Sequence, residues 1–372
     1  MKKFLVLLLV GLMVISSVFA EGQTESTKKV VDYDNMTKEE LIKTAQEEGT
    51  LMIYTPSSRH SAVGQIFGEK YGIKVETTQL KDIEMIEKVT KEAAANLDAA
   101  DVVYAQDGAR VYPEMIMTGY VQSYTPNSLK EKFLDQYKNP QVWEMCAKNF
   151  IINNEWPQNF NNVWALTDPK YKGKVQFKNP FSESVNMNFL TMVTRDDWAK
   201  KLAVSYKNYY GKDLVLTTKN AGYEWIKLWF GNGLVLGTSD TTMSENIGAK
   251  GQKEQLIGLF TSNKLRHCEA KNLALEVCKD VEPFNGFIYP IYVFIPSNSK
   301  SPAAARLFIE YSLTIDGFAP FISIGDYSPN PDLENPDDSQ TLEILSKTLI
   351  YEDPQWCSEH RAEVEEFISK LM

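Results

Sequence analysis

The chain has 372 residues, of which 43% are hydrophobic and 12% aromatic, and its formal net charge is −10 at pH 7. A chain of this length usually divides its core, so we expect two lobes. The acidic balance argues against a nucleic-acid or anionic-membrane partner, since both surfaces attract clustered Lys and Arg.

The first twenty residues have the pattern of a secretory signal. Lys2 and Lys3 are its charged head, residues 4–15 its apolar core, and Ala20 the predicted cleavage site. The alternative is an uncleaved N-terminal anchor, but the apolar run is shorter than the ~20 residues of a membrane span. No cysteine lies at the cleavage site, so no lipid attachment is expected. Residues 21–36 are polar and should form a flexible leader.

The segment after the leader alternates helical and strand patterns. Thr37 and Glu40 form a capping-box pattern for a short helix that should end at Gly49. Apolar runs and helical spacing then predict a strand at 50–54, a helix at 61–70, a strand at 73–77, a helix at 82–97 and a strand at 101–104. Such βαβ units predict a parallel sheet with right-handed crossovers, in a first lobe at 37–150.

The middle of the chain repeats this pattern after a predicted crossover at 149–154. A second lobe at 151–286 should contain strands at 174–177 and 234–236 and a helix at 196–208. Residues 287–372 should return to the first lobe and end in C-terminal helices, with a strand at 287–295 and helices at 302–314 and 358–371. The segment 325–340, rich in Pro, Asp, Asn and Ser, is expected to be a surface loop.

A candidate ligand cleft follows from this arrangement. Ligands of open α/β sheets bind beyond the carboxyl ends of the strands, where helix N-termini present unpaired N–H groups. Turns in such positions are predicted at 55–60, 105–108, 179–184 and 237–242. We expect these turns to converge on a cleft between the lobes.

Several sequence pieces, spread over most of residues 48–331, resemble one family of binding proteins. They read GTLMIYTPSS, FGEKYGIKVE, AADVVYAQDGA, WALTDPKYKGKVQFKNP, and PIYVFIPSNSKSPAAARLFIEYSL with SPNP soon after. In this order they resemble the periplasmic ferric-iron-binding proteins and their relatives for phosphosugars, thiamine and polyamines. The resemblance implies an α/β, two-lobed periplasmic-binding-protein fold of type II, with the ligand cleft between the lobes. It also implies a periplasmic monomer that delivers a small solute to an ABC permease and its cytoplasmic ATPase.

Iron(III) is the solute that the resemblance favours. Fe(III) is a hard cation that prefers phenolate and carboxylate oxygen. The candidate metal ligands near the predicted cleft are His60, Tyr104, Asp107 and Asp240. Ferric members generally hold the metal with paired tyrosines after a second-lobe strand, but residues 239–243 read SDTTM here. The adjacent Tyr209 and Tyr210 follow the helix at 196–208 and do not match that position.

The alternative solute is a phosphorylated or otherwise charged organic compound. Hydroxyl groups and backbone N–H groups at helix starts suit a phosphate. The candidate ligand-binding residues are Ser57, Ser58, His60, Asp107, Ser182, Ser184, Asp240 and Tyr289. Each also has an ordinary structural interpretation: the serines as helix N-caps, the aspartates as turn formers, His60 as an exposed residue and Tyr289 as a packing residue.

An exported hydrolase is the main alternative of another class. The sequence has no GxSxG, HExxH or P-loop motif, so no catalytic residue and no catalytic cofactor is expected, and Fe(III) would be cargo. The four cysteines lack CxxC spacing, and either a Cys268–Cys278 disulfide or free thiols would fit. Trp225 and Trp229, one helical turn apart, are expected in the core. We therefore expect a binding protein with no enzyme activity and no nucleic-acid partner.

Overall fold

The computed structural model describes residues 31–98, 100–335 and 340–372. The signal peptide predicted at 1–20 lies outside the described residues, as does most of the leader predicted at 21–36. At the end of that leader Tyr33–Asn35 forms a short 3-10 turn, and Asp34 pairs with Arg306 at 2.6 Å. No helix in the described ranges combines the length and the apolar character that a membrane span requires.

The described strands join into one mixed sheet of twelve strands, in the order β2-β1-β3-β10-β5-β8-β6-β7, with β4, β9, β11 and β12 attached to its long strands. Their bounds are β1 (Thr50–Thr55), β2 (Lys74–Gln79), β3 (Val102–Ala105), β4 (Val121–Ser123), β5 (Val142–Asn153), β6 (Val175–Lys178), β7 (Val235–Gly237), β8 (Ile257–Thr261), β9 (Leu275–Val277), β10 (Gly286–Pro296), β11 (Asp326–Tyr327) and β12 (Ile350–Tyr351). β1 pairs in parallel with β2 and β3, and β6 with β7 and β8. These two parallel groups confirm the predicted strands, whose bounds agree to within two residues.

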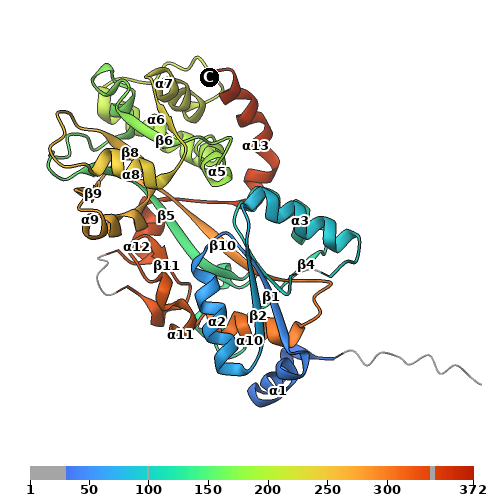
Figure 1. Cartoon of the computed structure of the whole chain (residues 1–372). Coiled ribbons are helices and arrows are strands. Elements are labelled where there is room, and N and C mark those ends of the chain that lie inside the picture. The colour runs from blue at the N-terminus through green and yellow to red at the C-terminus, as the bar shows by residue number, and fades with distance from the viewer. Residues whose placement is uncertain (1–30, 99, 336–339) are drawn as a thin grey trace, which may run out of the picture. The chain divides into compact units, whose positions relative to one another are not determined.

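The long strands β5 and β10 lie side by side at the centre of the sheet and connect its two parallel groups (Figure 1). They run antiparallel, with Gly286 opposite Asn149 at one end and Tyr292 opposite Val142 at the other. Every residue of both strands is buried, as expected of strands that are covered on both faces. The strand predicted at 287–295 is confirmed as β10, and residues 149–153 of the predicted crossover form the end of β5.

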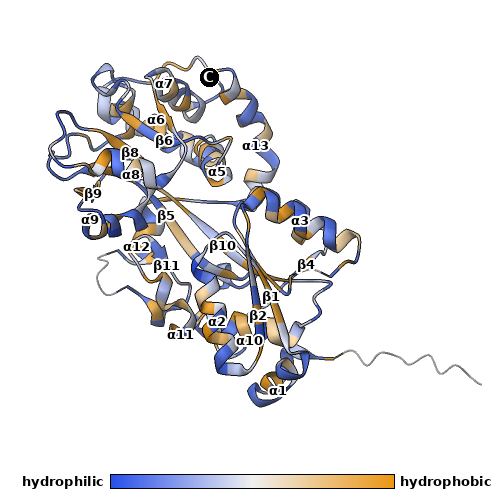
Figure 2. Cartoon of the chain, viewed as in Figure 1, coloured by the Kyte–Doolittle hydropathy of each residue, from blue (hydrophilic) through white to orange (hydrophobic). Residues whose placement is uncertain are grey.

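Helices flank this sheet, and most carry one apolar side. They are α1 (Lys38–Glu48), α2 (Arg59–Tyr71), α3 (Asp82–Ala94), α4 (Gly108–Val111), α5 (Ser184–Val193), α6 (Asp196–Tyr210), α7 (Ala221–Gly231), α8 (Asp240–Gly248), α9 (His267–Ala270), α10 (Pro302–Ser312), α11 (Ile315–Phe318), α12 (Leu342–Thr348) and α13 (Pro354–Ser369). Figure 2 shows hydrophobic colour along β1 and β8, while α3 and α13 carry both colours. Trp225 and Trp229 of α7 are buried and stacked at 4.7 Å, which confirms their place in the core.

The first helix shows how local sequence determines an element. The Thr37 hydroxyl oxygen accepts a hydrogen bond from the Glu40 backbone N–H at 3.2 Å, and the Glu40 carboxylate accepts one from the Thr37 backbone N–H at 2.9 Å. This confirms the capping box. Gly49 ends the helix at φ +73°, a left-handed conformation that glycine adopts without strain.

The prediction of a surface loop at 325–340 is wrong for residues 326–330. Asp326 and Tyr327 form β11, which pairs antiparallel with β5, and Asp326, Ser328 and Asn330 are buried. The Asn330 side chain donates to the carbonyl oxygen of Leu313 at 3.0 Å. The polar composition suggested solvent, but these side chains satisfy one another and the backbone, and the segment covers part of the edge of β5.

Candidate functional site

A row of polar side chains lies on one face of β5. Side chains of a strand alternate between its faces, so Glu144, Cys146 and Lys148 share one face. All three residues are buried, with exposed fractions of 2%, 6% and 0%. Burying the carboxyl group of Glu144 and the ammonium group of Lys148 on a central strand costs free energy unless each group is paired with a charge or binds a ligand.

The neighbouring strands extend this row at Cys146. Tyr289 of β10 lies opposite Cys146 on one side, and Asp326 of β11 lies opposite Cys146 on the other. We call the set of Glu144, Cys146, Lys148, Tyr289 and Asp326 the polar row. Residues far apart in the sequence are thus brought together by strand register alone.

One end of the polar row is a buried ion-pair network around Lys148. The Lys148 ammonium group donates to the carboxylate of Glu183 at 3.0 Å and to the side-chain oxygen of Asn186 at 2.9 Å. It also lies 3.8 Å from the Asp240 carboxylate, and Lys178 donates to Glu183 at 2.5 Å. Glu183 and Asp240 stand at the N-termini of α5 and α8. Two of the predicted turns, 179–184 and 237–242, therefore meet at this end.

Electrostatics in this network favour the charged forms. Burial works to raise the pKa of Glu183, but Lys148 and Lys178 outweigh it and lower that pKa to about 2. Burial works to lower the pKa of Lys148, but Asp240 and Glu183 outweigh it and raise the pKa. Glu183 and Lys148 therefore remain ionised at neutral pH.

Away from Lys148, toward the Glu144 end of the polar row, Asp326 lies beside Glu144 and Cys146 and contacts the N-terminus of α2. The Arg59 guanidinium lies 3.5 Å from the Asp326 carboxylate. Asn263 donates to both Asp326 oxygens at 2.9 and 3.1 Å, and the Ser323 hydroxyl donates at 3.0 Å. Burial raises the pKa of Asp326 although Arg59 opposes it. Asp326 thus connects the start of α2 with the 3-10 helix η7 (Ser262–Arg266).

Three basic side chains gather at this end. Burial lowers the pKa of Lys264, and the neighbouring Arg266 lowers it further. Burial also lowers the pKa of Arg266, and Arg59 adds to the effect. Among the described residues, the Lys264 ammonium group forms neither a hydrogen bond nor an ion pair, whereas Arg266 donates to the Asn263 carbonyl oxygen at 2.7 Å. Asp326 lies among these cations and opposes the lowering of the pKa of both Lys264 and Arg266.

The sequence profile of the bacterial extracellular solute-binding proteins matches residues 97–351, more than half of the chain. The chain belongs to this family. No curated protein matches its sequence. The family consists of binding proteins, as the sequence predicted, and the resemblance to ferric-binding and phosphosugar-binding relatives is confirmed.

Solved structures share the fold of this solute-binding protein at low sequence identity. Iron-bound HitA from Pseudomonas aeruginosa has a TM-score of 0.66 at 15% identity, covering 87% of this chain and 99% of HitA. The ferric binding protein from Campylobacter jejuni has a TM-score of 0.65 at 17% identity, covering 86% and 99%. AfuA from Actinobacillus pleuropneumoniae, with fructose-6-phosphate bound, has a TM-score of 0.64 at 18% identity, covering 87% and 98%. These likenesses confirm the predicted type II two-lobed fold.

Two of the predicted metal ligands lie in an aromatic core of the solute-binding protein. His60 stacks on Tyr104 at 4.1 Å and contacts the rings of Trp143 and Phe321 at 4.6 and 4.8 Å. Its Nδ1 atom hydrogen-bonds the Thr55 hydroxyl at 2.7 Å. Burial, with a smaller effect of Arg59, lowers the pKa of His60 to about 3. The interpretation of His60 as an exposed residue is wrong, since it is 1% exposed.

The other two predicted metal ligands have separate partners. The Asp107 carboxylate pairs with Arg361 of α13 at 2.8 Å and accepts from Asn188 of α5 at 3.2 Å. Asp240 belongs to the Lys148 network. The structure therefore does not gather His60, Tyr104, Asp107 and Asp240 into one coordination site, because each already belongs to a packed or paired environment.

The predicted serines and Tyr289 differ in their burial and in their hydrogen bonds. The Ser57 hydroxyl accepts from the Arg59 backbone N–H at 3.3 Å, whereas Ser58 is exposed and makes no capping bond. The Ser182 hydroxyl donates to the Asn179 carbonyl oxygen at 3.0 Å, and Ser184 is the buried first residue of α5. Tyr289 belongs to the polar row. Ser182 and Ser184 thus flank Glu183 in sequence, and Ser57 stands two positions before Arg59.

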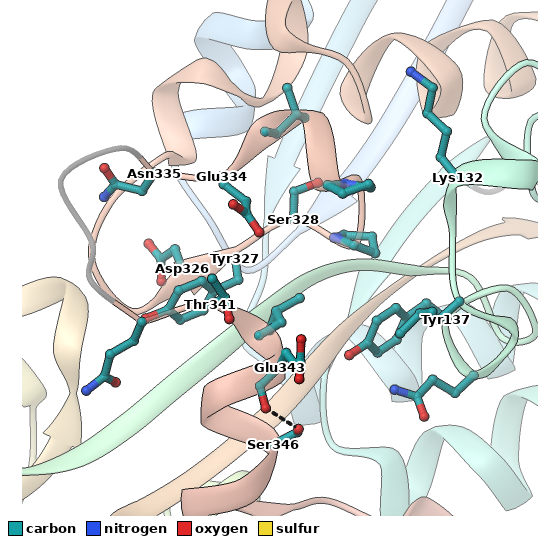
Figure 3. Close-up of a pocket in the computed structure, with 17 residues that line it drawn as sticks. Lys132, Tyr137, Asp326, Tyr327, Ser328, Glu334, Asn335, Thr341, Glu343 and Ser346 are labelled. Carbon is teal, nitrogen blue, oxygen red and sulfur yellow. Dashed lines mark hydrogen bonds between the residues drawn. The ribbon is translucent and has the colours of Figure 1, made fainter.

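A cavity of about 430 Å³ opens beside Asp326 (Figure 3). Figure 3 shows Asp326 and Tyr327 on one wall and Tyr137 on another. Its lining residues are Lys132, Leu134, Gln136, Tyr137, Asp326, Tyr327, Ser328, Pro329, Pro331, Leu333, Glu334, Asn335, Gln340, Thr341, Leu342, Glu343 and Ser346. The cavity shares Asp326 with the polar row, but its other lining residues come from different segments.

Other predicted features of the solute-binding protein also have structural partners. The hydroxyl groups of Tyr209 and Tyr210 both donate hydrogen bonds to the Asp168 carboxylate, at 3.0 and 2.5 Å. The four cysteines are free thiols, so Cys268 and Cys278 form no disulfide.

The central residues of the site escaped sequence analysis. Arg59, Glu144, Lys148, Lys264 and Asp326 were not candidates. One signal was available in the sequence WEMCAK at 143–148, where polar residues alternate with apolar ones inside a strand that is otherwise apolar.

Proposed function

We propose that this chain is the exported substrate-binding component of an ABC importer, and that its solute is a small organic anion. The observation that carries the choice of solute is the group of Arg59, Lys264 and Arg266 at the Asp326 end of the polar row. In a chain whose formal net charge is −10, these cations lie close enough for Arg59 to lower the pKa of Arg266 and for Arg266 to lower that of Lys264. An anion would relieve their repulsion and supply the partner that Lys264 lacks among the described residues.

Helix N-termini support the same solute class. Ser57 and Ser58 precede α2, and Ser182 and Ser184 lie at the start of α5. Hydroxyl and backbone N–H groups in such positions bind phosphate or carboxylate groups. The fold neighbours include binders of a metal and of an organic anion, iron in HitA and fructose-6-phosphate in AfuA. The separation of His60 and Tyr104 from Asp107 and Asp240 favours the organic anion over bare Fe(III).

The remaining parts of the function follow from the family and the leader. We propose that the signal peptide is cleaved near Ala20, that the mature chain works in the periplasm as a monomer, and that a permease with a cytoplasmic ATPase receives its solute. Export would place the binding site on the outer side of the membrane, where an importer collects solute.

Calorimetric titration of the mature protein tests the choice of solute. The panel contains a phosphosugar, citrate, ferric citrate, thiamine and a polyamine. We expect an anion to bind, and Lys264→Gln and Arg266→Gln each to weaken it by about tenfold or more, since a hydrogen bond to a charged group contributes about 1.5–3 kcal/mol. Lys212→Gln is the control, because Lys212 is exposed just after α6. Binding of a polyamine, or of iron without the organic anion, with no loss in Lys264→Gln would refute the proposal.

A further inference from the structure

Three potential metal ligands meet inside the polar row. One ligand atom each from Glu144, Cys146 and Asp326 lies within 4.8 Å of the other two, and all three residues are buried. Among the described residues, these are the His, Cys, Asp or Glu side chains that come this close together in a group of three. None of the three was a predicted metal ligand.

Strand geometry explains why these groups meet. Glu144 and Cys146 are two residues apart on β5 and so point to the same face. Asp326 of β11 is the direct cross-strand partner of Cys146, which places its side chain on that face as well. The ligands are therefore fixed on two hydrogen-bonded strands, a rigid support for a coordination site.

An unpartnered carboxylate oxygen provides independent support for a ligand. Glu144 is 2% exposed, and its Oε1 atom is buried without a hydrogen-bond partner among the described residues. An unsatisfied buried acceptor of this kind carries a desolvation cost that a protein rarely retains without a role. A cation beside Oε1 would satisfy it.

We propose that Glu144, Cys146 and Asp326 bind a divalent transition metal ion of the zinc class. A thiolate together with two carboxylates suits a borderline cation such as Zn²⁺, whereas Mg²⁺, Ca²⁺ and Fe³⁺ prefer oxygen ligands alone. Three protein ligands leave one tetrahedral position open for water or another oxygen donor. Arg59, 3.5 Å from Asp326, would offset the surplus negative charge of three anionic ligands on a divalent ion.

The inference does not depend on the identity of the transported solute. The ion would tie β11 to β5 and so hold the segment after Asp326 against the central strand. Metal binding to the folded chain alone should also raise the melting temperature with metal concentration.

Metal titration of the mature protein tests the proposal. The protein is stripped with a chelator, dialysed, and titrated with Zn²⁺ and separately with Co²⁺, with bound metal measured by elemental analysis. We expect one equivalent of either ion, and a thiolate-to-cobalt charge-transfer band in the near-ultraviolet spectrum. Cys146→Ser should remove this band, whereas Cys278→Ser should retain it, because Cys278 is also a buried free thiol but lies outside the cluster.

Glu144→Gln provides a second variant of nearly unchanged shape. It should weaken Zn²⁺ binding at least tenfold, in keeping with the loss of a charged ligand, while circular dichroism shows a folded chain. The proposal is overturned if the stripped wild-type protein takes up no stoichiometric Zn²⁺ or Co²⁺, or if the thiolate band survives in Cys146→Ser. Unchanged metal affinity in Glu144→Gln would also overturn it.

Discussion

Replacing Lys148 with methionine tests whether this buried lysine stabilises the carboxylates around it. The Lys148 side chain is 1% exposed, and those of Glu183 and Asp240 are 15% and 12% exposed. Methionine retains a flexible, unbranched chain of similar length, so Lys148→Met removes the charge with little change of volume. The variant therefore isolates the electrostatic contribution at the centre of the sheet.

The pKa of Glu183 sets the magnitude. Against the effect of burial, Lys148 and Lys178 lower it from the ordinary 4.5 to about 2. One pKa unit corresponds to about 1.4 kcal/mol, so the net stabilisation of charged Glu183 is roughly 3 kcal/mol. Loss of Lys148 removes one of the two cations that stabilise charged Glu183, and it also leaves Asp240 without this cation. We expect Lys148→Met to lower the free energy of unfolding by about 2–3 kcal/mol.

The sign of the pH dependence follows from the depressed pKa. The contribution of Glu183 is present above its unfolded-state pKa near 4.5 and is lost as the pH falls toward 2. The stability difference between wild type and Lys148→Met should therefore shrink in that window.

Urea unfolding at pH 7 and at pH 3 measures both effects. Lys178→Met is the matched control, because Lys178 also pairs with Glu183 but its side chain is 20% exposed. We expect a loss of about 1 kcal/mol for this control, since partly exposed ion pairs contribute less. The reasoning is refuted if Lys148→Met lies within about 0.5 kcal/mol of wild type at pH 7, or if its deficit does not shrink in acid.

Two further predictions concern stability elsewhere in the fold. Burial, followed by the nearby Asp107, raises the pKa of Glu352 to about 8, so its contribution is present below pH 4.5 and is lost as the pH rises toward 8. Wild-type urea midpoints should therefore fall between pH 5 and pH 8, and Glu352→Gln should fall less; an identical decline would contradict this. At Gly286 (φ +134°) an added Cβ would lie 2.0 Å from the Lys148 carbonyl oxygen, so Gly286→Ala should cost more than about 2 kcal/mol. Gly119→Ala, where φ is +70° but nothing lies within 4 Å, should cost about 1 kcal/mol, and equal losses in urea would refute the steric argument.

The regular elements were predictable because their signals are local. The Thr37 capping box and the left-handed Gly49 at the end of α1 depend on residues within one or two helical turns. The strand at 287–295 was predictable from its continuous apolar run, which is typical of a strand buried on both faces. Element order then indicated the fold.

The candidate site was not predictable in the same way, because strand register creates it. Asp326 lies 180 positions after Cys146 in the sequence, and only the pairing of β11 with β5 places them together. Local composition led to a wrong prediction here, since the polar residues of 325–340 favoured a surface loop although Asp326 is buried in β11. Lys148 was not predictable either, because a buried lysine on a central strand is stable only when it is paired. Its partners Glu183 and Asp240 lie at the starts of two helices that are distant in the sequence.

The turns, by contrast, could be located but not given their roles. Residues 179–184 and 237–242 were predicted near a cleft, and both do reach Lys148 through Glu183 and Asp240. The prediction named Ser182 and Ser184, whereas the neighbouring Glu183 is the residue that pairs. Which side chain of a turn points toward a partner depends on backbone angles that sequence patterns do not specify.

The length of β5 keeps two buried ion pairs apart. Glu144 and Lys148 are four residues apart, a span of roughly 14 Å along an extended strand. Asp326 and Arg59 stand near one end, and Glu183 and Asp240 near the other. Arg59 thus balances Asp326 at one place on the strand, and Lys148 balances Glu183 at another. A substitution that removes one of these cations leaves the other ion pair in place.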